Sequence, residues 1–392
     1  MKQMLLGALA LSVVAANAGA ASEDVNTLKI KQLKDQLEAQ QEQIDALADA
    51  LENKSGSTGA EWFNKTTIGG YGEHHFNHKK GGSGDKADDQ VDAHRFVLFI
   101  GHEFTDTVLF FSEVELEHSL AGDGKPGEVE LEQAYIEWDY ASAHSLIMGQ
   151  FLLPVGIINE THEPDTFYGV ERNLVESRII PATWWETGVM SQGEIAQGLS
   201  YNIAVHSGLY TEPTSDGIEA IRSGRQKSAE ANAEDLAYTT RIKYTGVKGL
   251  EAAITYQHQQ DLTQSDENSA ETNSADLIVA HVIYNVGDFG VRALWAEWDI
   301  DGDVPEASGQ DQQEGYYIEG SYKLRSDLGV FARFEEYDEK AGSDADTEKE
   351  ASVVGVNYWL ADTVVIKADY TDIDAEGVDD VDSINLGIGW SY

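Results

Sequence analysis

The stretch Ser383–Tyr392, S-I-N-L-G-I-G-W-S-Y, alternates between two kinds of residue along its whole length. Its even-numbered positions are Ile, Leu, Ile, Trp and Tyr, and its odd-numbered positions are Ser, Asn or Gly. A period of two places these two sets on opposite faces of a β-strand. The polar face of a soluble sheet would carry Lys, Glu or Thr to meet bulk water, whereas this one is small and weakly polar. The pattern therefore favours a strand of a membrane barrel, with lipid outside and a lumen inside, over an edge strand of a soluble sandwich.

The composition agrees with a membrane barrel. The 392 residues include no Cys but 37 Gly, 17 Tyr and 8 Trp, as expected of a barrel with aromatic girdles at its two membrane interfaces. The formal net charge is −44, which a barrel can distribute over long external loops and its lumen. Because no basic face is present to neutralise phosphate groups, we expect no nucleic-acid partner.

Residues 1–20 have the pattern of a secretory signal peptide. Lys2 precedes the apolar run Met4–Val14, and Ala18-Gly19-Ala20 supply the small residues of a cleavage site. We therefore expect cleavage after Ala20, with Ala18 as the alternative, and export from the cytoplasm.

Residues 21–52 carry a narrow apolar seam at alternating spacings of three and four. The seam consists of Ile30, Leu33, Leu37, Gln40, Ile44, Leu47 and Leu51. We expect a short N-terminal coiled-coil helix that gains stability from a larger oligomer. The alternative is an amphipathic helix lying on the periplasmic end of the barrel. Residues 53–65, which begin N-K-S-G-S-T-G-A, are the predicted linker.

Residues 66–392 form the predicted barrel, because alternating segments of about ten residues recur there about sixteen times. They lie near 66–76, 94–105, 107–118, 129–140, 144–153, 183–195, 199–210, 236–246, 249–260, 274–286, 289–300, 314–326, 328–338, 349–360, 363–372 and 381–392. Their connections alternate between tight turns such as Thr105-Asp106 and long acidic loops such as Asp261–Asn273. That asymmetry is typical of bacterial outer-membrane barrels. The sequence therefore predicts an all-β transmembrane barrel of about sixteen antiparallel strands around a water-filled lumen, preceded by the coiled-coil helix.

Three motifs resemble one known family. They are I-M-G-Q-F-L-L-P-V-G at Ile147–Gly156, G-V-N-Y-W-L at Gly355–Leu360 and V-I-K-A-D-Y at Val365–Tyr370. Together they resemble the phosphate-selective porin family of Gram-negative outer membranes, over about Thr66–Tyr392. The resemblance implies a sixteen-stranded homotrimeric porin in the cell outer membrane, in contact with lipid and lipopolysaccharide. The N-terminal helix would then lie in the periplasm.

The expected function is passive diffusion of small hydrophilic solutes or ions, with phosphate and other anions among them, and without a cofactor. The alternative is an envelope-tethering structural barrel whose coiled coil anchors the outer membrane to the cell wall. Deleting residues 21–60 separates the two. A tether would lose envelope attachment with conductance intact, whereas a pore organised by the coiled coil would lose trimers.

Charged residues at inward positions of the strands are the candidates for the lumen lining. A phosphate route needs Arg and Lys that replace the water of the anion, whereas rings of acids favour cations. The candidates are Glu113, Glu115, Glu117, Arg241, Lys243, Lys323, Arg333 and Lys367. Since both signs are present, the sequence leaves the ion preference open.

The connection from about Leu153 to Ala182 differs from the other long loops because it is rich in bulky apolar residues. A loop in water has no reason to be apolar, whereas a loop folded into the barrel does. We expect this loop to narrow the pore; the alternative is an external loop packed against a neighbouring subunit. Its charged candidates for the constriction are Glu160, Glu163, Asp165, Glu171, Arg172, Glu176 and Arg178. Trp184 and Trp185 start the next strand and are expected in an aromatic girdle.

No catalytic or metal-binding constellation is predicted. His74 and His75 are adjacent on a strand and point to opposite faces, so they do not share one ion easily. His206 and Ser207 are separated in the same way, and no nucleophile stands beside a base and an acid. We therefore expect no enzymatic activity, no metal site and no cofactor.

Overall fold

The structure is a computed structural model that describes residues 59–80, 89–214, 217–218, 220–265, 273–375 and 381–392. The chain divides into two units, residues 1–64 and residues 65–392. The predicted signal peptide and coiled-coil helix lie outside the described residues. Within the stretch predicted as a linker, Gly59–Asn64 form the short helix α2. Among the described residues, no helix has the length and apolar character needed to span a membrane.

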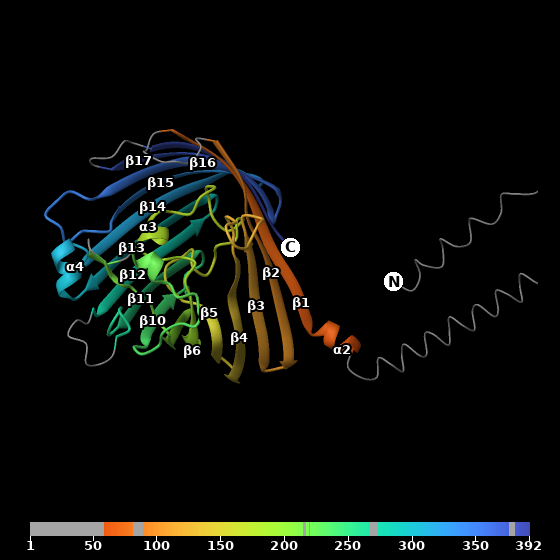
Figure 1. The fold of residues 1–392 in the computed structure, drawn as a ribbon. Coiled ribbons are helices and arrows are strands. Elements are labelled where there is room, and N and C mark those ends of the chain that lie inside the picture. The colour runs from red at the N-terminus through yellow and green to blue at the C-terminus, as the bar shows by residue number, and fades with distance from the viewer. Residues whose placement is uncertain (1–58, 81–88, 215–216, 219, 266–272, 376–380) are drawn as a thin grey trace, which may run out of the picture. The chain divides into compact units, whose positions relative to one another are not determined.

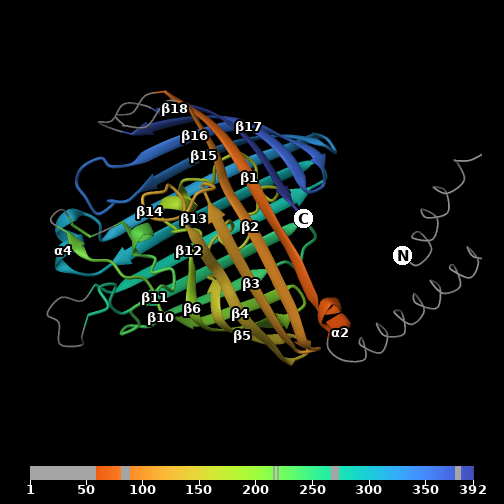
Figure 2. The ribbon, with the colours of Figure 1, turned by 45° about the vertical axis from the view of Figure 1, so that its right-hand side comes forward.

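Residues 65–392 contain a closed antiparallel barrel of sixteen strands, which confirms the predicted fold and strand number (Figures 1 and 2). The strands are β1 (Thr66–Lys80), β2 (Asp89–Thr105), β3 (Val108–Glu117), β4 (Val129–Ala141), β5 (His144–Leu152), β6 (Trp185–Ala196), β7 (Leu199–His206), β10 (Ala237–Tyr244), β11 (Leu250–Gln259), β12 (Ala275–Val286), β13 (Phe289–Ile300), β14 (Gln312–Arg325), β15 (Leu328–Asp338), β16 (Lys349–Ala361), β17 (Val364–Ala375) and β18 (Val381–Ser391). Between them lie α3 (Val175–Arg178), β8 (Pro213–Thr214), β9 (Gly217–Ile218), the 3-10 helix η1 (Ile221–Gly224) and α4 (Asp303–Ser308). The end with the tight connections is called the turn end below, and the opposite end the loop end.

Strand β18 closes the barrel by pairing with β1 as well as β17. The backbone of Tyr392 exchanges two hydrogen bonds with Gly70, at 2.9 and 3.0 Å. Ile384 and Leu386 are exposed on the outer face, whereas Ser383 and Asn385 are buried on the inner face. The period of two in the last strand therefore reports its two environments as predicted.

The seam between β1 and β18 requires a glycine at position 72. Gly72 pairs with Trp390, and a Cβ atom at position 72 would lie 2.6 Å from Cζ2 of the indole ring. A Gly72→Ala variant should lose about 1–3 kcal/mol of unfolding free energy, because the ring must leave its position across the seam. Urea unfolding in detergent micelles measures the loss. The matched control is Gly320→Ala on β14, where an added Cβ meets no atom within 4 Å among the described residues. Equal stability of the two variants would contradict the packing of Trp390 on the seam.

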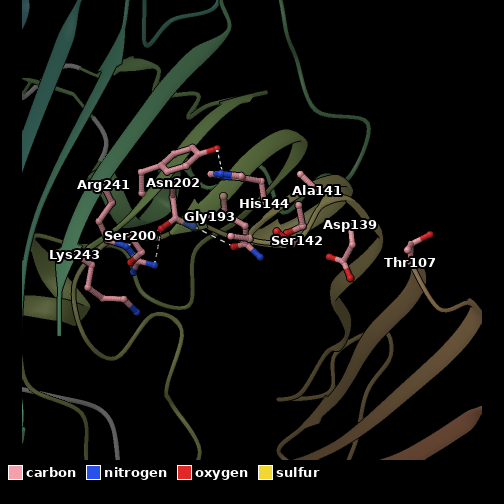
Figure 3. A pocket seen from close by; sticks show the side chains of 14 residues that line it. Thr107, Asp139, Ala141, Ser142, His144, Gly193, Ser200, Asn202, Arg241 and Lys243 are labelled. Carbon is pink, nitrogen blue, oxygen red and sulfur yellow. Dashed lines mark hydrogen bonds between the residues drawn. The ribbon is translucent and has the colours of Figure 1, made fainter. Parts of the chain in front are cut away.

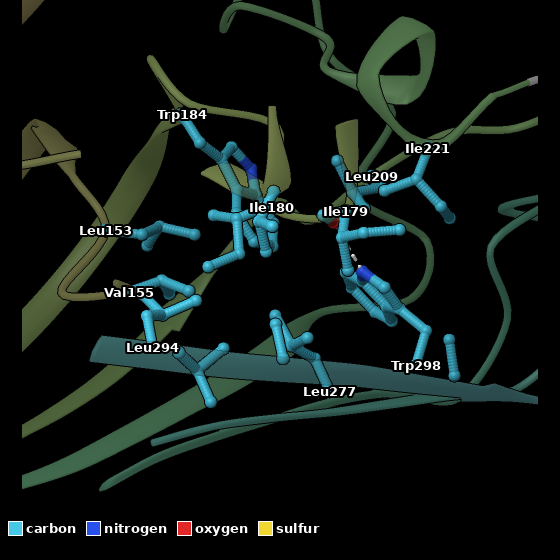
Figure 4. Packing of buried hydrophobic residues seen from close by; sticks show 14 of the residues in the cluster. Leu153, Val155, Ile179, Ile180, Trp184, Leu209, Ile221, Leu277, Leu294 and Trp298 are labelled. Atoms are coloured by element: carbon cyan, nitrogen blue, oxygen red, sulfur yellow. Dashed lines mark hydrogen bonds between the residues drawn. The ribbon is translucent and has the colours of Figure 1, made fainter. Parts of the chain in front are cut away.

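Part of the barrel interior is an apolar core rather than open lumen. Residues 153–184, between β5 and β6 and called the inner loop below, supply Leu153, Val155, Ile179 and Ile180 to it. Leu277, Leu294 and Trp298 come from the barrel wall, and Leu209 and Ile221 from the connection 207–236 (Figure 4). Burying these side chains away from water holds both connections inside the barrel.

Trp184 belongs to this core, and the prediction of a girdle residue at this position is wrong. Its side chain is fully buried, its ring centroid lies 6.3 Å from that of Trp298, and its indole N–H donates to Glu186 at 2.9 Å. The apolar character of the residue reflects packing inside the barrel rather than contact with the membrane interface.

Candidate functional site: the lumen and its inner loop

The inner loop contacts strands around most of the circumference of the barrel. Taken along the inner loop from Pro154 to Glu176, the partners on the wall are Thr255 on β11, Arg241 on β10, Glu113 on β3, Ser391 on β18, Arg292 on β13, Asn357 on β16, Asp369 on β17, His75 on β1, Glu335 on β15 and Tyr317 on β14. A segment that touches so many strands on different sides must cross the interior. The views in Figures 1 and 2 agree, since this connection lies within the ring of strands in both.

Glu176 fastens the base of the inner loop. Its side chain is 0% exposed, and its Oε1 accepts the backbone N–H groups of Ile157 and Ile158 at 2.5 and 2.7 Å. Its Oε2 accepts the amide of Asn173 at 2.9 Å and the hydroxyl of Tyr317 at 3.0 Å. The buried Glu176 therefore holds the base of the loop in place by hydrogen bonds. The prediction that its charge faces the passage is wrong.

Replacing Glu176 with Ala should cost at least about 3 kcal/mol, because two buried backbone N–H groups and the Tyr317 hydroxyl would lose their acceptor. Thermal unfolding in detergent measures the loss, and single-channel recordings should show added noise from an undocked loop. The control is Arg178→Ala, because Arg178 lies in the same short helix as Glu176 but is exposed. If both variants unfold alike, Glu176 does not hold the loop.

The tip of the inner loop is tied to the wall by ion pairs. Glu160 pairs with the guanidinium of Arg241, which also donates to Asn202 at 2.9 Å. Glu171 lies 3.2 Å from a ring nitrogen of His75. Burial alone would raise the pKa of Glu171, but the hydrogen bond and positive charge of His75 lower it to about 2. The carboxylate is thus charged at any physiological pH and holds the tip against β1.

Arginines from both connections gather beside the base of the inner loop. Arg222 donates to the backbone carbonyls of Ala182 and Ser177, and Arg225 donates to that of Thr183. Burial and the neighbouring charges of Arg225, Arg172 and Arg178 lower the pKa of Arg222. Since a guanidinium stays charged at neutral pH, positive charge gathers beside the base of the inner loop, where Glu117, Glu130, Glu132 and Glu186 also act on Arg225. Arg222 and Arg225 were not among the predicted lining residues, although the sequence I-R-S-G-R mixes apolar and basic residues much as the inner loop does.

Cavities lie on both sides of the inner loop. One of about 530 Å³ opens toward the loop end and is lined by the ends of β1, β2, β3, β17 and β18. A second of about 730 Å³ lies at the turn end, where Arg241 and Lys243 point into it (Figure 3). A third of about 690 Å³ lies between the tip of the inner loop and the turns around Lys248 and Asn285.

Basic and acidic side chains are nearly balanced in these three cavities. Among the described lining residues, the nine basic ones are Lys79, Arg95, Arg172, Arg222, Arg241, Lys243, Lys248, Arg292 and Arg333. The eight acidic ones are Glu73, Asp92, Glu117, Asp139, Glu160, Glu171, Glu251 and Glu335. The whole chain has 26 Lys and Arg against 70 Asp and Glu, so the lining departs strongly from the average of the chain.

Of three predicted basic lining residues, one is ion-paired and two lie beside aromatic rings. Arg333 contacts Glu319 at 3.2 Å and Glu335 at 2.5 Å. Lys367 is 2% exposed and lies 3.7 Å from the ring centroid of Phe167 on the inner loop. Lys323 remains exposed and lies 5.3 Å from the ring of Trp359.

The remaining predicted residues divide between wall and loop. Glu113 and Glu115 are 2% exposed, and the side chain of Glu115 lies 3.8 Å from that of Arg95. Glu117 is partly exposed and lines the cavity at the loop end. On the inner loop, Asp165 accepts a hydrogen bond from Ser391 at 2.6 Å, and burial raises the pKa of Glu163.

Comparison with known proteins gives matches along most of the chain. A family model described as Gram-negative porin matches residues 7–378. A protein of Aquifex aeolicus (strain VF5), described as uncharacterized, is 28% identical over 355 residues that cover 83% of this chain and 80% of that protein. The solved structure of an anion-selective porin from Comamonas acidovorans has a TM-score of 0.60 at 11% identity, with 83% of this chain and 99% of that chain covered. The trimer form of OmpT, an outer membrane protein of Vibrio cholerae, has a TM-score of 0.53 at 12% identity, with 84% and 100% covered. At these identities the two solved structures share the fold with this chain.

Proposed function

Because this chain belongs to the Gram-negative porin family, we propose that its outer-membrane channel carries small hydrophilic solutes and ions by passive diffusion, small anions included. The aqueous path is narrowed by the inner loop and lined by nearly equal numbers of basic and acidic groups. The observation that carries this proposal is the contrast between the balanced lining and the acidic chain. Ions inside the narrow part respond to the groups that line it, since charges beyond a Debye length are screened.

The arginines beside the inner loop favour anions at the narrowest part. One guanidinium nitrogen of Arg172, Nη2, is buried and donates to no partner among the described residues, and Arg172 lines the cavity at the loop end. A passing chloride or phosphate can replace part of its water with such N–H donors. The paired acids repel a passing anion less than free acids would, because Arg95 neutralises Glu73 at 2.8 Å and Arg333 neutralises Glu335 at 2.5 Å.

The rest of the assembly follows from the same proposal. Residues 1–20 would direct export and be removed, and residues 21–52 would form a coiled coil in the periplasm, since β1 begins at the turn end of the barrel. Three chains would form a homotrimer embedded in lipid and lipopolysaccharide, as the trimer form of the Vibrio cholerae protein suggests. A pure tether without transport is disfavoured by the charged cavities on both sides of the inner loop.

Swelling of proteoliposomes tests the channel. Vesicles that contain the full-length protein should swell in isotonic solutions of small neutral and anionic solutes, with rates that fall steeply with solute size because the inner loop limits the passage. Vesicles that swell no faster than protein-free ones would overturn the proposal and favour the tether.

A further inference from the structure

Three buried ligand groups meet where the inner loop touches β3 and β4. Nε2 of His162 lies 3.5 Å from Oε1 of Glu113 and 3.4 Å from Oε2 of Glu132. The three side chains are 3%, 2% and 0% exposed. None of these groups belongs to the three cavities that line the passage, so the cluster needs an explanation of its own.

A β-bulge places Glu132 in this cluster. Glu113 pairs with Gln133 and Val114 pairs with Leu131, so Glu132 is the extra residue on β4. At the bulge two consecutive residues face the interior, because Glu132 follows the exposed Leu131 and the side chain of Gln133 reaches Glu113 as well. Neither carboxylate oxygen of Glu132 has a hydrogen-bond donor among the described residues. Burying a carboxylate without donors is costly unless a positive charge lies beside it.

The histidine is oriented with one nitrogen toward the two carboxylates. Nδ1 of His162 lies 3.1 Å from the carbonyl oxygen of Asn159, to which it donates. Asn159 is itself fixed, since its side chain bonds the backbone of Leu153 and Trp184 at 2.6 to 2.9 Å. In the neutral ring, Nε2 then carries a lone pair directed at Glu113 and Glu132. Such a group of three electron donors needs a cation among them, either a proton on Nε2 or a metal ion.

We propose that Glu113, Glu132 and His162 bind a divalent transition-metal ion of the zinc class. Two carboxylates and one imidazole are a ligand set that such ions take, with a fourth position left for water. Metal–ligand bonds of about 2.0–2.1 Å in a tetrahedron place neighbouring ligand atoms about 3.3–3.4 Å apart. The two observed separations, 3.4 and 3.5 Å, match this spacing and exceed the roughly 2.7–2.9 Å of a charge-assisted hydrogen bond.

Two further contacts support the metal ligands. Gln133 donates to Oε2 of Glu113 at 2.7 Å, whereas Oε1 accepts a long hydrogen bond of 3.5 Å from the Tyr71 hydroxyl and lies toward the histidine. The carbonyl of Asn159 fixes the tautomer of His162 in the way that partners of metal-bound histidines do. The ion would clamp the tip of the inner loop to the wall between β3 and β4, and so stabilise the constriction.

The competing cation is a proton. Burial would lower the pKa of His162, but the hydrogen bonds and negative charges of Glu113 and Glu132 raise it to about 10. An imidazolium between the carboxylates would hold the loop without metal. The two cases differ in metal content, which can be measured without reference to transport.

Metal content of the full-length protein decides between them. The test uses a His94→Ala, His118→Ala background, because Asp92, His94 and His118 form a more exposed group that can hold ions on its own. The protein is refolded in detergent with Zn²⁺ or Co²⁺ and then dialysed against a weak chelator. We expect one ion per chain, a visible absorption spectrum of four-coordinate Co²⁺, and a Zn²⁺-dependent rise in melting temperature that Mg²⁺ does not cause.

Three variants complete the test. His162→Ala and the isosteric Glu132→Gln should each lose the ion and the Zn²⁺-dependent rise, whereas His258→Ala on β11 should retain both. If the His94→Ala, His118→Ala protein retains no ion after dialysis, and its melting temperature changes with neither Zn²⁺ nor chelator, the proposal is overturned in favour of the imidazolium. Equal ion content in the Glu132→Gln variant would also overturn it. Since swelling is scored separately, a channel without metal would refute this inference and leave the proposed function intact.

Discussion

Removing the tip of the inner loop, residues 160–172, should raise the single-channel conductance by at least about two-fold, since a sixteen-stranded barrel without it has a wide lumen. A short Gly-Ser linker would join Asn159 to Asn173. The base of the loop should stay in place because Glu176 and the apolar core hold it independently of the tip. Conductance of single channels in planar bilayers measures the effect.

The matched control shortens an external connection instead. Deleting residues 340–346, between β15 and β16, removes acidic chain from the loop end but no part of the inner loop. That variant should conduct like the unaltered protein at high salt. If the tip deletion folds and its conductance is unchanged, the inner loop does not limit the passage.

Reversing one charge beside the inner loop should change the ion preference. At about 6 Å in water, a unit charge acts on a passing ion with about 0.7 kcal/mol. Reversing the charge with Arg172→Glu therefore changes the energies of chloride and potassium by about 1.4 kcal/mol each, in opposite directions, and should lower the chloride-to-potassium permeability ratio by up to about 100-fold. The residue is well placed for this because it lines the cavity at the loop end. The zero-current potential under a KCl gradient measures the ratio.

Arg325→Glu makes the same change in charge outside the lumen. Arg325 is exposed and pairs with Asp327 at 2.8 Å in the turn between β14 and β15. Its zero-current potential at high salt should equal that of the unaltered protein. Equal shifts in the two variants would mean that net charge, rather than the lining, sets the preference.

The barrel could be predicted from the sequence because its strands carry two different environments at a period of two. Segments such as 289–300 and 328–338 coincide with β13 and β15 to the residue. The tight turns indicated that consecutive strands are neighbours. In the last strand, Ile384 and Leu386 identified the face that contacts lipid. These signals are local, since each strand reports its own two faces.

The packing of side chains inside the barrel was harder to predict from the sequence. The apolar residues of the inner loop pointed to burial, but periodicity does not give the partners, so Glu176 was taken for a lining charge and Trp184 for a girdle residue. Both errors come from long-range packing with β13 and β14. The bulge at Glu132 is a change of register with no signature in the strand pattern.

The most direct test of the loop-narrowed, charge-balanced passage is the zero-current potential of the unaltered protein at two salt concentrations. At ~1 M KCl the Debye length is ~3 Å and only lining groups act, whereas at ~0.01 M it is ~30 Å and the acidic loops act as well. We predict an anion-selective sign with chloride current reduced by added phosphate at high salt, shifting toward cations at low salt. A strongly cation-selective sign at high salt, with no effect of phosphate, would contradict this account. It would mean that the acidic residues determine the ion selectivity of the channel.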